Sequence, residues 1–247
     1  MRLLVFSDVH ANATALEAAL SACAGAWDFA ACLGDLVGYG PDPNQVIQRV
    51  RPLVTAIVRG NHDKAVSGIS DSEDFNPVAR AAVEWTRGQL SPENLAYLKN
   101  LPQGPVESHG AALVHGAVED EDEYIFAPEQ ALPGLRTSPQ PVTFFGHTHI
   151  PGGFSYNGSA VVRIDLSFGR GAASNMVHLE PGVRYLLNPG AIGQPRDGDP
   201  RAAFAIADFN KRTVEFWRTP YDIAAVQDRM ERAGAPEPLI LRLAFGR

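Results

Sequence analysis

The sequence predicts an α/β protein built on two sheets, and three observations support this. Patterns typical of buried strands and of helices alternate over roughly the first hundred residues, which favours a largely parallel sheet. The second half carries short strand candidates separated by Gly, Pro, Asn and Asp, and predicts a second sheet, mostly antiparallel or mixed, packed against the first. No Gly/Ser-rich linker divides the halves, so we expect a single domain over residues 1–247.

Each element is predicted from its own pattern. Residues 2–7 form an apolar run without alternation, typical of a strand covered on both faces. Asn12 then precedes apolar residues at helical spacing and is a candidate N-cap. In the first half we expect further strands at residues 29–33 and 53–58, and helices at 44–50, 77–89 and 92–99. In the second half we expect strands at residues 111–114, 142–145, 153–156, 161–164, 176–179, 184–187, 203–207 and 213–217, and a helix at 223–232.

Charge and cysteine content argue against several classes of protein. With 21 basic and 28 acidic residues the net charge is -7, so we expect neither stable nucleic-acid binding nor attraction to an anionic membrane. Cys23 and Cys32 are the two cysteines, too few for a disulfide framework, which predicts a cytoplasmic protein. No apolar run reaches the roughly 18 residues of a membrane span. Small phosphorylated substrates stay compatible with this composition.

Polar clusters follow five of the strand candidates. Because the carboxyl ends of parallel strands line a common crevice, residues distant in sequence can converge there. Five of the 7 histidines fall in these clusters, a concentration that scattered structural histidines would not show. The clusters are Asp8-Val9-His10, Gly34-Asp35, Gly60-Asn61-His62-Asp63, His115-Gly116 and Gly146-His147-Thr148-His149.

The donors in these clusters suit divalent transition metals. Carboxylate, amide and imidazole ligands favour an ion such as Mn, Fe, Zn, Co or Ni, and without cysteine a structural zinc site is not expected. The candidate ligands are more numerous than one tetrahedral ion uses, but they fit two ions that share a carboxylate. Two metals roughly 3.5–4 Å apart stabilise the attacking and leaving oxygens of a phosphoryl group. The set therefore predicts phosphoester hydrolysis.

These motifs, in this order, resemble the signature of the calcineurin-like metallophosphoesterases. The resemblance spans Asp8 to His149 and extends through residues 188–196, Asn-Pro-Gly-Ala-Ile-Gly-Gln-Pro-Arg, which are similar to the small prokaryotic phosphodiesterase-like branch. It implies a four-layer α/β/β/α sandwich, in which two mixed sheets pack face to face with helices outside.

The resemblance also implies a role for each candidate residue. Asp35 would bridge two metal ions, because a carboxylate can donate to both cations and cancel part of their charge. His62 would not bind metal but would face the phosphate and protonate the leaving oxygen. The other ligands would divide between the ions, with Asp8, His10 and His149 on one and Asn61, His115 and His147 on the other.

One segment departs from the family pattern. In the protein Ser/Thr phosphatase branch and the dinucleoside-tetraphosphate hydrolases, Gly-Asp is followed by a segment ending in Asp-Arg-Gly. Here Gly38 stands where an Asp would orient the catalytic histidine, and Tyr39 stands where an Arg would grip the phosphate. Classical protein phosphatase activity is therefore not expected, and what orients His62 is left open. Asp63 is adjacent in sequence.

Other polar residues receive simpler interpretations. We interpret His109 and His178 as structural or exposed, Asn12 as a helix cap, and the acidic run at residues 119–123 as a solvated loop. The alternative for the acidic run is a position beside the site, where it would repel highly anionic substrates. Arg196 or Arg201 could contact a substrate phosphate, so substrate-binding residues are left unassigned.

The resulting hypothesis is a cytoplasmic phosphoesterase with two divalent metal ions, manganese among the candidates, acting on a small phosphorylated molecule. A phosphodiester is preferred, attacked by a hydroxide that bridges the metals. The alternatives are a phosphomonoesterase, a dinucleotide hydrolase or a non-catalytic scaffold of the same fold. The sequence does not define the substrate, the native metal or the oligomeric state.

Overall fold

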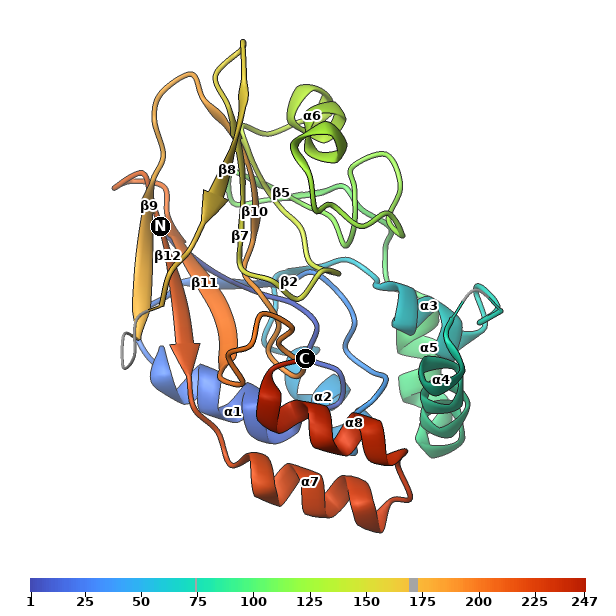
Figure 1. Ribbon diagram of the computed structural model, residues 1–247. Coiled ribbons are helices and arrows are strands. Elements are labelled where there is room, and N and C mark those ends of the chain that lie inside the picture. Colours follow the sequence, from blue (N-terminus) through green and yellow to red (C-terminus); the bar gives the residue numbers. More distant parts are fainter. Residues whose placement is uncertain (74, 169–172) are drawn as a thin grey trace.

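The computed structural model describes residues 1–73, 75–168 and 173–247, which form two mixed sheets packed face to face (Figure 1). Within these residues the first sheet has the strand order β3-β2-β1-β11-β12-β9, and the second has the order β4-β5-β6-β10-β7-β8. The strands are β1 (Arg2–Phe6), β2 (Phe29–Cys32), β3 (Ala56–Ile57), β4 (Val106–Ser108), β5 (Ala111–Leu113), β6 (Val142–Phe144), β7 (Gly152–Tyr156), β8 (Val161–Asp165), β9 (Ser174–His178), β10 (Arg184–Asn188), β11 (Ala202–Asp208) and β12 (Thr213–Thr219).

Helices cover the outer faces of both sheets. Helix α1 packs on β11 and β12 of the first sheet, and α6 packs on β7, β8 and β10 of the second, at the opposite end of Figure 1. The α-helices of the described chain are α1 (Ala13–Ala22), α2 (Pro43–Val50), α3 (Asn61–Ser67), α4 (Pro77–Gln89), α5 (Pro92–Lys99), α6 (Pro128–Thr137), α7 (Ile223–Arg232) and α8 (Glu237–Arg242). Among them, none combines the length and apolar character needed to cross a lipid bilayer.

The four layers form because successive side chains along each buried strand point to opposite faces of its sheet. On β1, Leu3 and Val5 pack between the two sheets, whereas Leu4 and Phe6 pack under the helices of the first sheet. On β10, Leu187 likewise faces the first sheet and Leu186 faces α6. Successive side chains point to opposite faces of a strand, so a strand with two covered faces needs apolar residues at every position. The predicted α/β/β/α sandwich of two mixed sheets is confirmed.

The division of strands between the sheets differs from the expectation. Strands β9, β11 and β12, expected in the second sheet, complete the first one, where β11 pairs antiparallel with β1. Only β1, β2 and β3 form the parallel part of the first sheet. The apolar pattern of β11 satisfies either sheet equally well, so its partner is decided by long-range packing.

Some elements were shorter than expected or were missed. The strand expected at residues 53–58 is limited to Ala56–Ile57, and no helix was expected where α3 begins at Asn61. The sequence analysis also missed β4, α6 and α8. Helix α6 contains Pro133, which lacks an N–H donor and hides the helical pattern.

The C-terminal helices reach back to the first half of the chain. Residues of α7 and α8, among them Val226, Met230 and Leu239, pack in one apolar cluster with Tyr39 and with Ala79 of α4. Figure 1 shows α7 and α8 on the same side as α1 and α2. The loop after β2 is thereby covered by the end of the chain.

Candidate metal centre

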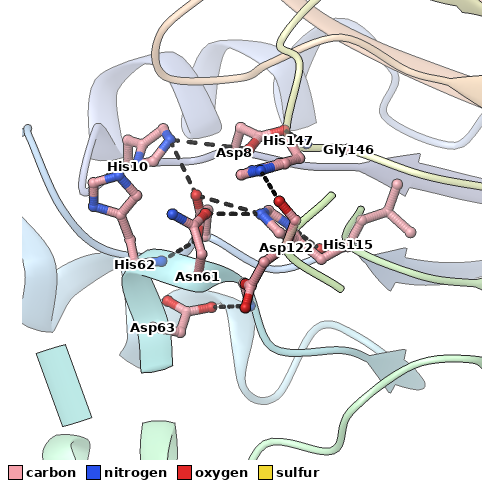
Figure 2. Close-up of polar contacts among 12 residues, drawn as sticks. Asp8, His10, Asn61, His62, Asp63, His115, Asp122, Gly146 and His147 are labelled. Atoms are coloured by element: carbon pink, nitrogen blue, oxygen red, sulfur yellow. Dashed lines mark hydrogen bonds and ion pairs between the residues drawn. The ribbon is translucent and has the colours of Figure 1, made fainter. Parts of the chain in front are cut away.

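The structure brings the seven candidate ligands together. Asp8 and His10 follow β1, Asp35 follows β2, and Asn61 begins α3 just beyond β3. His115 follows β5 and His147 follows β6 in the second sheet, with His149 two residues on. Parallel pairing of β1 with β2 and of β5 with β6 sends these loops out of the same ends of the two sheets. Figure 2 shows side chains from both sheets meeting in one place.

The first cluster contains Asp8, His10, Asp35 and His149, all buried, with donor atoms close enough to share one metal ion. His10 Nε2 lies 3.2 Å from His149 Nε2. The latter atom lies 3.3 Å from Asp8 Oδ1, and His10 Nε2 lies 3.5 Å from Asp35 Oδ2. Two imidazoles and two carboxylates therefore surround a single point.

The second cluster contains Asp35, His115 and His147, also with donors in reach of one ion. His115 Nε2 lies 3.6 Å from Asp35 Oδ2 and 3.2 Å from the amide oxygen of Asn61 (Figure 2). The same Asp35 oxygen thus lies near one histidine of each cluster. This is the position that a carboxylate shared between two ions would take.

Backbone carbonyls fix the tautomers of the four clustered histidines. A carbonyl oxygen only accepts, so the ring nitrogen facing it carries the proton and the other nitrogen is left with a lone pair. The donations run from His10 Nδ1 to Val37 (3.0 Å), from His149 Nδ1 to Gln194 (2.6 Å), from His115 Nδ1 to Leu33 (2.8 Å), and from His147 Nε2 to Asp122 (3.1 Å).

Two lone pairs therefore face each other across the first cluster. His10 Nε2 and His149 Nε2 are 3.2 Å apart and neither carries a proton. Beside them, buried Asp8 Oδ1 accepts no hydrogen bond from the described residues. Lone-pair donors at this distance repel unless a cation lies between them, and a buried carboxylate oxygen needs a donor or a cation. The donor set therefore fits a divalent metal.

Burial dominates the electrostatics of the cluster. It raises the pKa of Asp8 to about 7 and the pKa of Asp35 well above its usual range. It lowers the pKa of His147 to about 2 and the pKa values of His10 and His149 well below theirs. Each shift favours the neutral form, because the protein replaces the water that would solvate a charge. A divalent cation reverses this preference for the carboxylates.

Backbone strain is concentrated at the centre. Five candidate ligands adopt left-handed backbone angles, with φ between 46° and 66°, a conformation that costs non-glycine residues about 1–3 kcal/mol each. They are Asp8, His10, Asp35, His147 and His149. Close packing adds a further constraint, since a Cβ at Gly60 would lie 2.0 Å from Asp35 Oδ1. The surrounding fold holds these loops in place at a cost to stability.

His62 lies beside His10 of the first cluster in an aromatic environment. Its ring centroid is 4.4 Å from that of Tyr39, 4.9 Å from Phe75 and 5.0 Å from His10. Burial lowers the pKa of His62 to about 3, and the charges of Arg196 and His115 act in the same direction. Its backbone N–H donates to Asp35 Oδ1 at 2.9 Å, which joins the His62 main chain to the shared carboxylate.

No carboxylate of the described chain orients the His62 ring. Its Nδ1 is buried without a hydrogen-bond partner, and a Cβ at Gly38 (φ 90°) would lie only 2.5 Å from that atom. Asp63 points elsewhere and accepts from the backbone N–H groups of Leu36, Val37 and Gly60. The ring is therefore positioned by packing rather than by an acidic partner.

A cavity of 320 Å³ adjoins the second cluster. It is lined by Asn61, His62 and His147 of the centre. Its aromatic lining residues are Tyr39, Phe75 and Tyr124, and its acidic ones are Asp71 and Asp122. Tyr124 stacks on His147 with ring centroids 3.7 Å apart. The sequence analysis missed Tyr124 and Phe75 because neither belongs to a motif.

The acidic run at residues 119–123 is not simply a solvated loop, and that interpretation was wrong for Glu121. Glu121 is buried and forms ion pairs with Arg59 (2.8 Å) and Lys64 (3.0 Å). Asp122 pairs with Lys64 (2.5 Å) and lines the cavity, while its carbonyl holds His147. Because Lys64 belongs to α3, this network ties the loop to the helix that carries His62.

The two arginines weighed as phosphate contacts have different surroundings. Arg201 is bound by Asp199, 2.6 Å away, two residues earlier in the same loop. Arg196 instead lies next to the centre, where its backbone N–H contacts the His149 carbonyl at 3.4 Å.

The simpler interpretations of other residues agree with the structure. Asn12 caps α1 by accepting from the Ala15 N–H. His109 stacks on Phe29, and His178 is exposed on β9. Both described cysteines are buried free thiols.

The fold and the donor set together define a metal-binding α/β protein, and comparisons with known proteins specify its class. A family model described as the calcineurin-like phosphoesterase superfamily domain matches residues 1–212. An uncharacterized protein of Methanocaldococcus jannaschii is 32% identical over 251 residues, with 99% of this chain and 98% of that protein covered. The chain belongs to the calcineurin-like phosphoesterase superfamily, as the order of its motifs indicated.

Solved structures agree with this membership. The crystal structure of a metallophosphoesterase from Sphaerobacter thermophilus is 41% identical, with a TM-score of 0.85 over 100% of this chain and 99% of that one. A hypothetical protein from Pyrococcus horikoshii OT3 is 21% identical, with a TM-score of 0.80 over 100% of this chain and 98% of that one, which supports the fold. Membership of this superfamily indicates a phosphoric ester hydrolase with divalent metal ions and a small phosphorylated substrate.

Proposed function

We propose that the protein is a dinuclear metallophosphoesterase that hydrolyses a small phosphodiester. The observation that carries this proposal is the pair of unprotonated nitrogens, His10 Nε2 and His149 Nε2, which face each other at 3.2 Å beside two buried carboxylates. A purely structural polar cluster would place a proton between such atoms. Here both protons are already donated to backbone carbonyls.

The donor geometry favours two ions rather than one. Asp8, His10 and His149 would hold the first ion, and Asn61, His115 and His147 would hold the second. Asp35 would contribute to both, since its Oδ2 lies 3.5 Å from His10 Nε2 and 3.6 Å from His115 Nε2. Mn, Fe, Zn, Co and Ni all suit this mixture of imidazole and oxygen donors.

When bound, the two ions would lower the pKa of water towards neutrality and neutralise the oxygens of a phosphoryl group. His62 would donate a proton to the leaving alkoxide, because it lines the cavity together with Asn61 and His147 and its ring lies beside His10. An anionic phosphate favours the protonated imidazole and opposes the burial that lowers the pKa of His62. Packing by Tyr39 and Phe75 would keep the ring facing the cavity.

The cavity favours a diester over a highly charged monoester. Its volume of 320 Å³ accommodates an organic substituent, and Tyr39, Phe75 and Tyr124 provide apolar contact for it. Asp71 lines the same space and disfavours additional negative charge, whereas the charge of Asp122 is offset by Lys64, which also lines the cavity. A diester has one ionised oxygen, whereas a monoester above its second pKa of roughly 6 carries two negative charges.

The test compares turnover of bis(4-nitrophenyl) phosphate, 4-nitrophenyl phosphate and a dinucleoside polyphosphate, with Mn, Co, Ni or Zn added to chelator-treated protein. We expect the diester to have the highest kcat/KM and turnover to disappear in the chelated protein. Asp35→Ala, purified identically, controls for a contaminating phosphatase. A strong preference for the monoester or the dinucleotide would replace the diesterase proposal. Metal binding without turnover of any substrate would indicate a non-catalytic scaffold.

A further inference from the structure

Unsatisfied donors lie in the loop after β10, beside the first metal cluster. Arg196 Nη2 donates to Gln194 Oε1 at 3.1 Å, and its backbone N–H contacts the His149 carbonyl. Arg196 Nε and Gln194 Nε2 are both buried, and neither finds an acceptor among the described residues. Gln194 itself is 1% exposed, and its carbonyl fixes the His149 tautomer. Buried donors without acceptors are costly, so an absent acceptor is indicated.

The positive charge of Arg196 affects the pKa values of several residues in and around the centre. It lowers the pKa values of Asp8, Asp35 and Tyr39 against the larger effect of burial, which raises each of them. Burial also raises the pKa of Tyr124, and the Arg196 charge together with a side-chain hydrogen bond opposes that shift. Together with its backbone contact to His149, this shows that Arg196 is close to the metal ligands and to Tyr39 and Tyr124, which line the cavity.

A second guanidinium approaches from the end of the chain. Arg242 of α8 is half-buried; burial lowers its pKa, the Arg196 charge lowers it further, and Tyr39 opposes the shift. Among the described residues, no Asp or Glu side chain forms an ion pair with Arg196 or Arg242, and Arg242 Nε donates to the Arg247 carbonyl oxygen. Two neighbouring guanidinium cations without an acidic side chain between them repel each other, and an anion bound between them relieves that repulsion.

We propose that Arg196 and Arg242 bind the phosphate group of the substrate, with Arg196 as the principal contact and Gln194 as an additional donor. This inference rests on the proposed function, because the phosphate must lie beside the two ions. The planar guanidinium fork matches the spacing of two phosphoryl oxygens. Helix α8 thereby contributes to substrate binding from the opposite end of the sequence, through its packing with Tyr39.

Arg201 provides a matched control in the same loop. Its guanidinium is bound by Asp199, with Nη2 2.6 Å from Oδ2 and Nε 3.0 Å from Oδ1. A side chain already saturated by a carboxylate has little capacity for phosphate. Arg201→Met removes the same charge from the same loop without removing a proposed phosphate contact.

The experiment measures inorganic phosphate binding to metal-loaded protein by calorimetry, alongside kcat and KM for bis(4-nitrophenyl) phosphate. Arg196→Met should weaken phosphate binding about 10–100-fold, the range for loss of charge-assisted hydrogen bonds. Arg242→Met should weaken it several-fold, and Arg201→Met should leave it unchanged. Metal content, measured by mass spectrometry, should equal that of the wild type in all three variants.

Each result has one interpretation. Phosphate affinity within twofold of the wild type in both Arg196→Met and Arg242→Met would overturn the inference while leaving the proposed function standing. Should Arg196→Met lose metal, Arg196→Lys decides instead: it keeps the charge but not the fork, so reduced phosphate affinity supports the inference and wild-type affinity refutes it. Wild-type protein that neither binds phosphate nor turns over any ester would overturn both proposals.

Discussion

The two metal clusters are built differently although they share Asp35. In the first, Asp8, His10 and His149 are at most 1% exposed, and the ring protons of the two histidines go to backbone carbonyls in the protein interior. In the second, Asn61 is only half-buried and borders the cavity together with His147. The first cluster belongs to the core of the fold, whereas the second forms a wall of the cavity.

The contacts that hold His147 also distinguish the second cluster from the first. Its Nε2 donates to the carbonyl of Asp122, whose own side chain is half exposed, and its ring stacks on the exposed side chain of Tyr124. A ligand held by a surface loop reorients more easily than one held by the core. We therefore expect the first ion to bind tightly and exchange slowly, and the second to bind more weakly and exchange readily.

The largest effect should come from Asp35→Ala, which removes the group common to both clusters. Without this carboxylate neither set of donors balances the charge of an ion, so both ions should be lost and turnover should fall to background. Metal analysis after gel filtration and the diester assay measure the two effects. Retention of one ion per chain would show that the clusters are independent and that Asp35 is not shared.

His62→Ala should separate catalysis from metal binding. Its ring lies beside His10 but is not needed to bind either ion, so both ions should remain while kcat falls about 10²–10⁴-fold, as expected for loss of a general acid. His178→Ala, on the exposed face of β9, is the matched control and should have no effect. Equal metal loss in His62→Ala and Asp35→Ala would contradict the separate roles.

Gly38→Ala should disturb the His62 ring without touching a ligand. The added Cβ would approach Nδ1 to 2.5 Å at a backbone φ of 90°, so the ring must move. A displacement of about 1 Å at a catalytic group costs up to about 100-fold in rate. We expect kcat to fall about 10–100-fold with metal content unchanged. Gly88→Ala is the control, because a Cβ at that position meets nothing within 4 Å.

Unaltered kcat in Gly38→Ala would mean that the His62 ring is not held against this glycine during turnover. Higher activity in Gly38→Asp than in Gly38→Ala would also contradict the proposal that packing alone positions His62. That result would show that the loop can open to admit an acidic partner.

The sequence analysis predicted those features of the two metal clusters that depend on local sequence pattern. All seven candidate ligands follow strands whose apolar runs are visible in isolation, and the shared edge of parallel strands explains their convergence. The division of the strands between the two sheets was not predictable in the same way. Strand β11 pairs with β1 across most of the chain length, and its pattern of small and apolar residues suits either sheet.

The residues that the sequence analysis missed are positioned by packing rather than by motif. Helix α8 packs on the loop of Tyr39, and no signal in residues 237–242 indicates this contact. Tyr124 lies in a loop whose acidic composition suggested solvent exposure. Buried ion pairs with Arg59 and Lys64 reverse that expectation for neighbouring Glu121, since charge patterns alone do not reveal a partner distant in sequence.

The smallest effect should come from Glu121→Gln, which tests whether the two clusters differ in strength. Glu121 anchors the loop through Arg59 and Lys64, and the next residue, Asp122, holds His147. Weakening this anchor should lower the affinity for the second ion, which His147 would bind, about tenfold. This is the lower end of the range for residues that support a metal ligand indirectly. The affinity for the first ion should stay unchanged. Chelator titration followed by metal analysis should show one ion released early. Glu123→Gln, an exposed neighbour, should match the wild type. Equal weakening of both ions in Glu121→Gln would mean that the buried cluster depends on this loop as much as the cavity-lining one does.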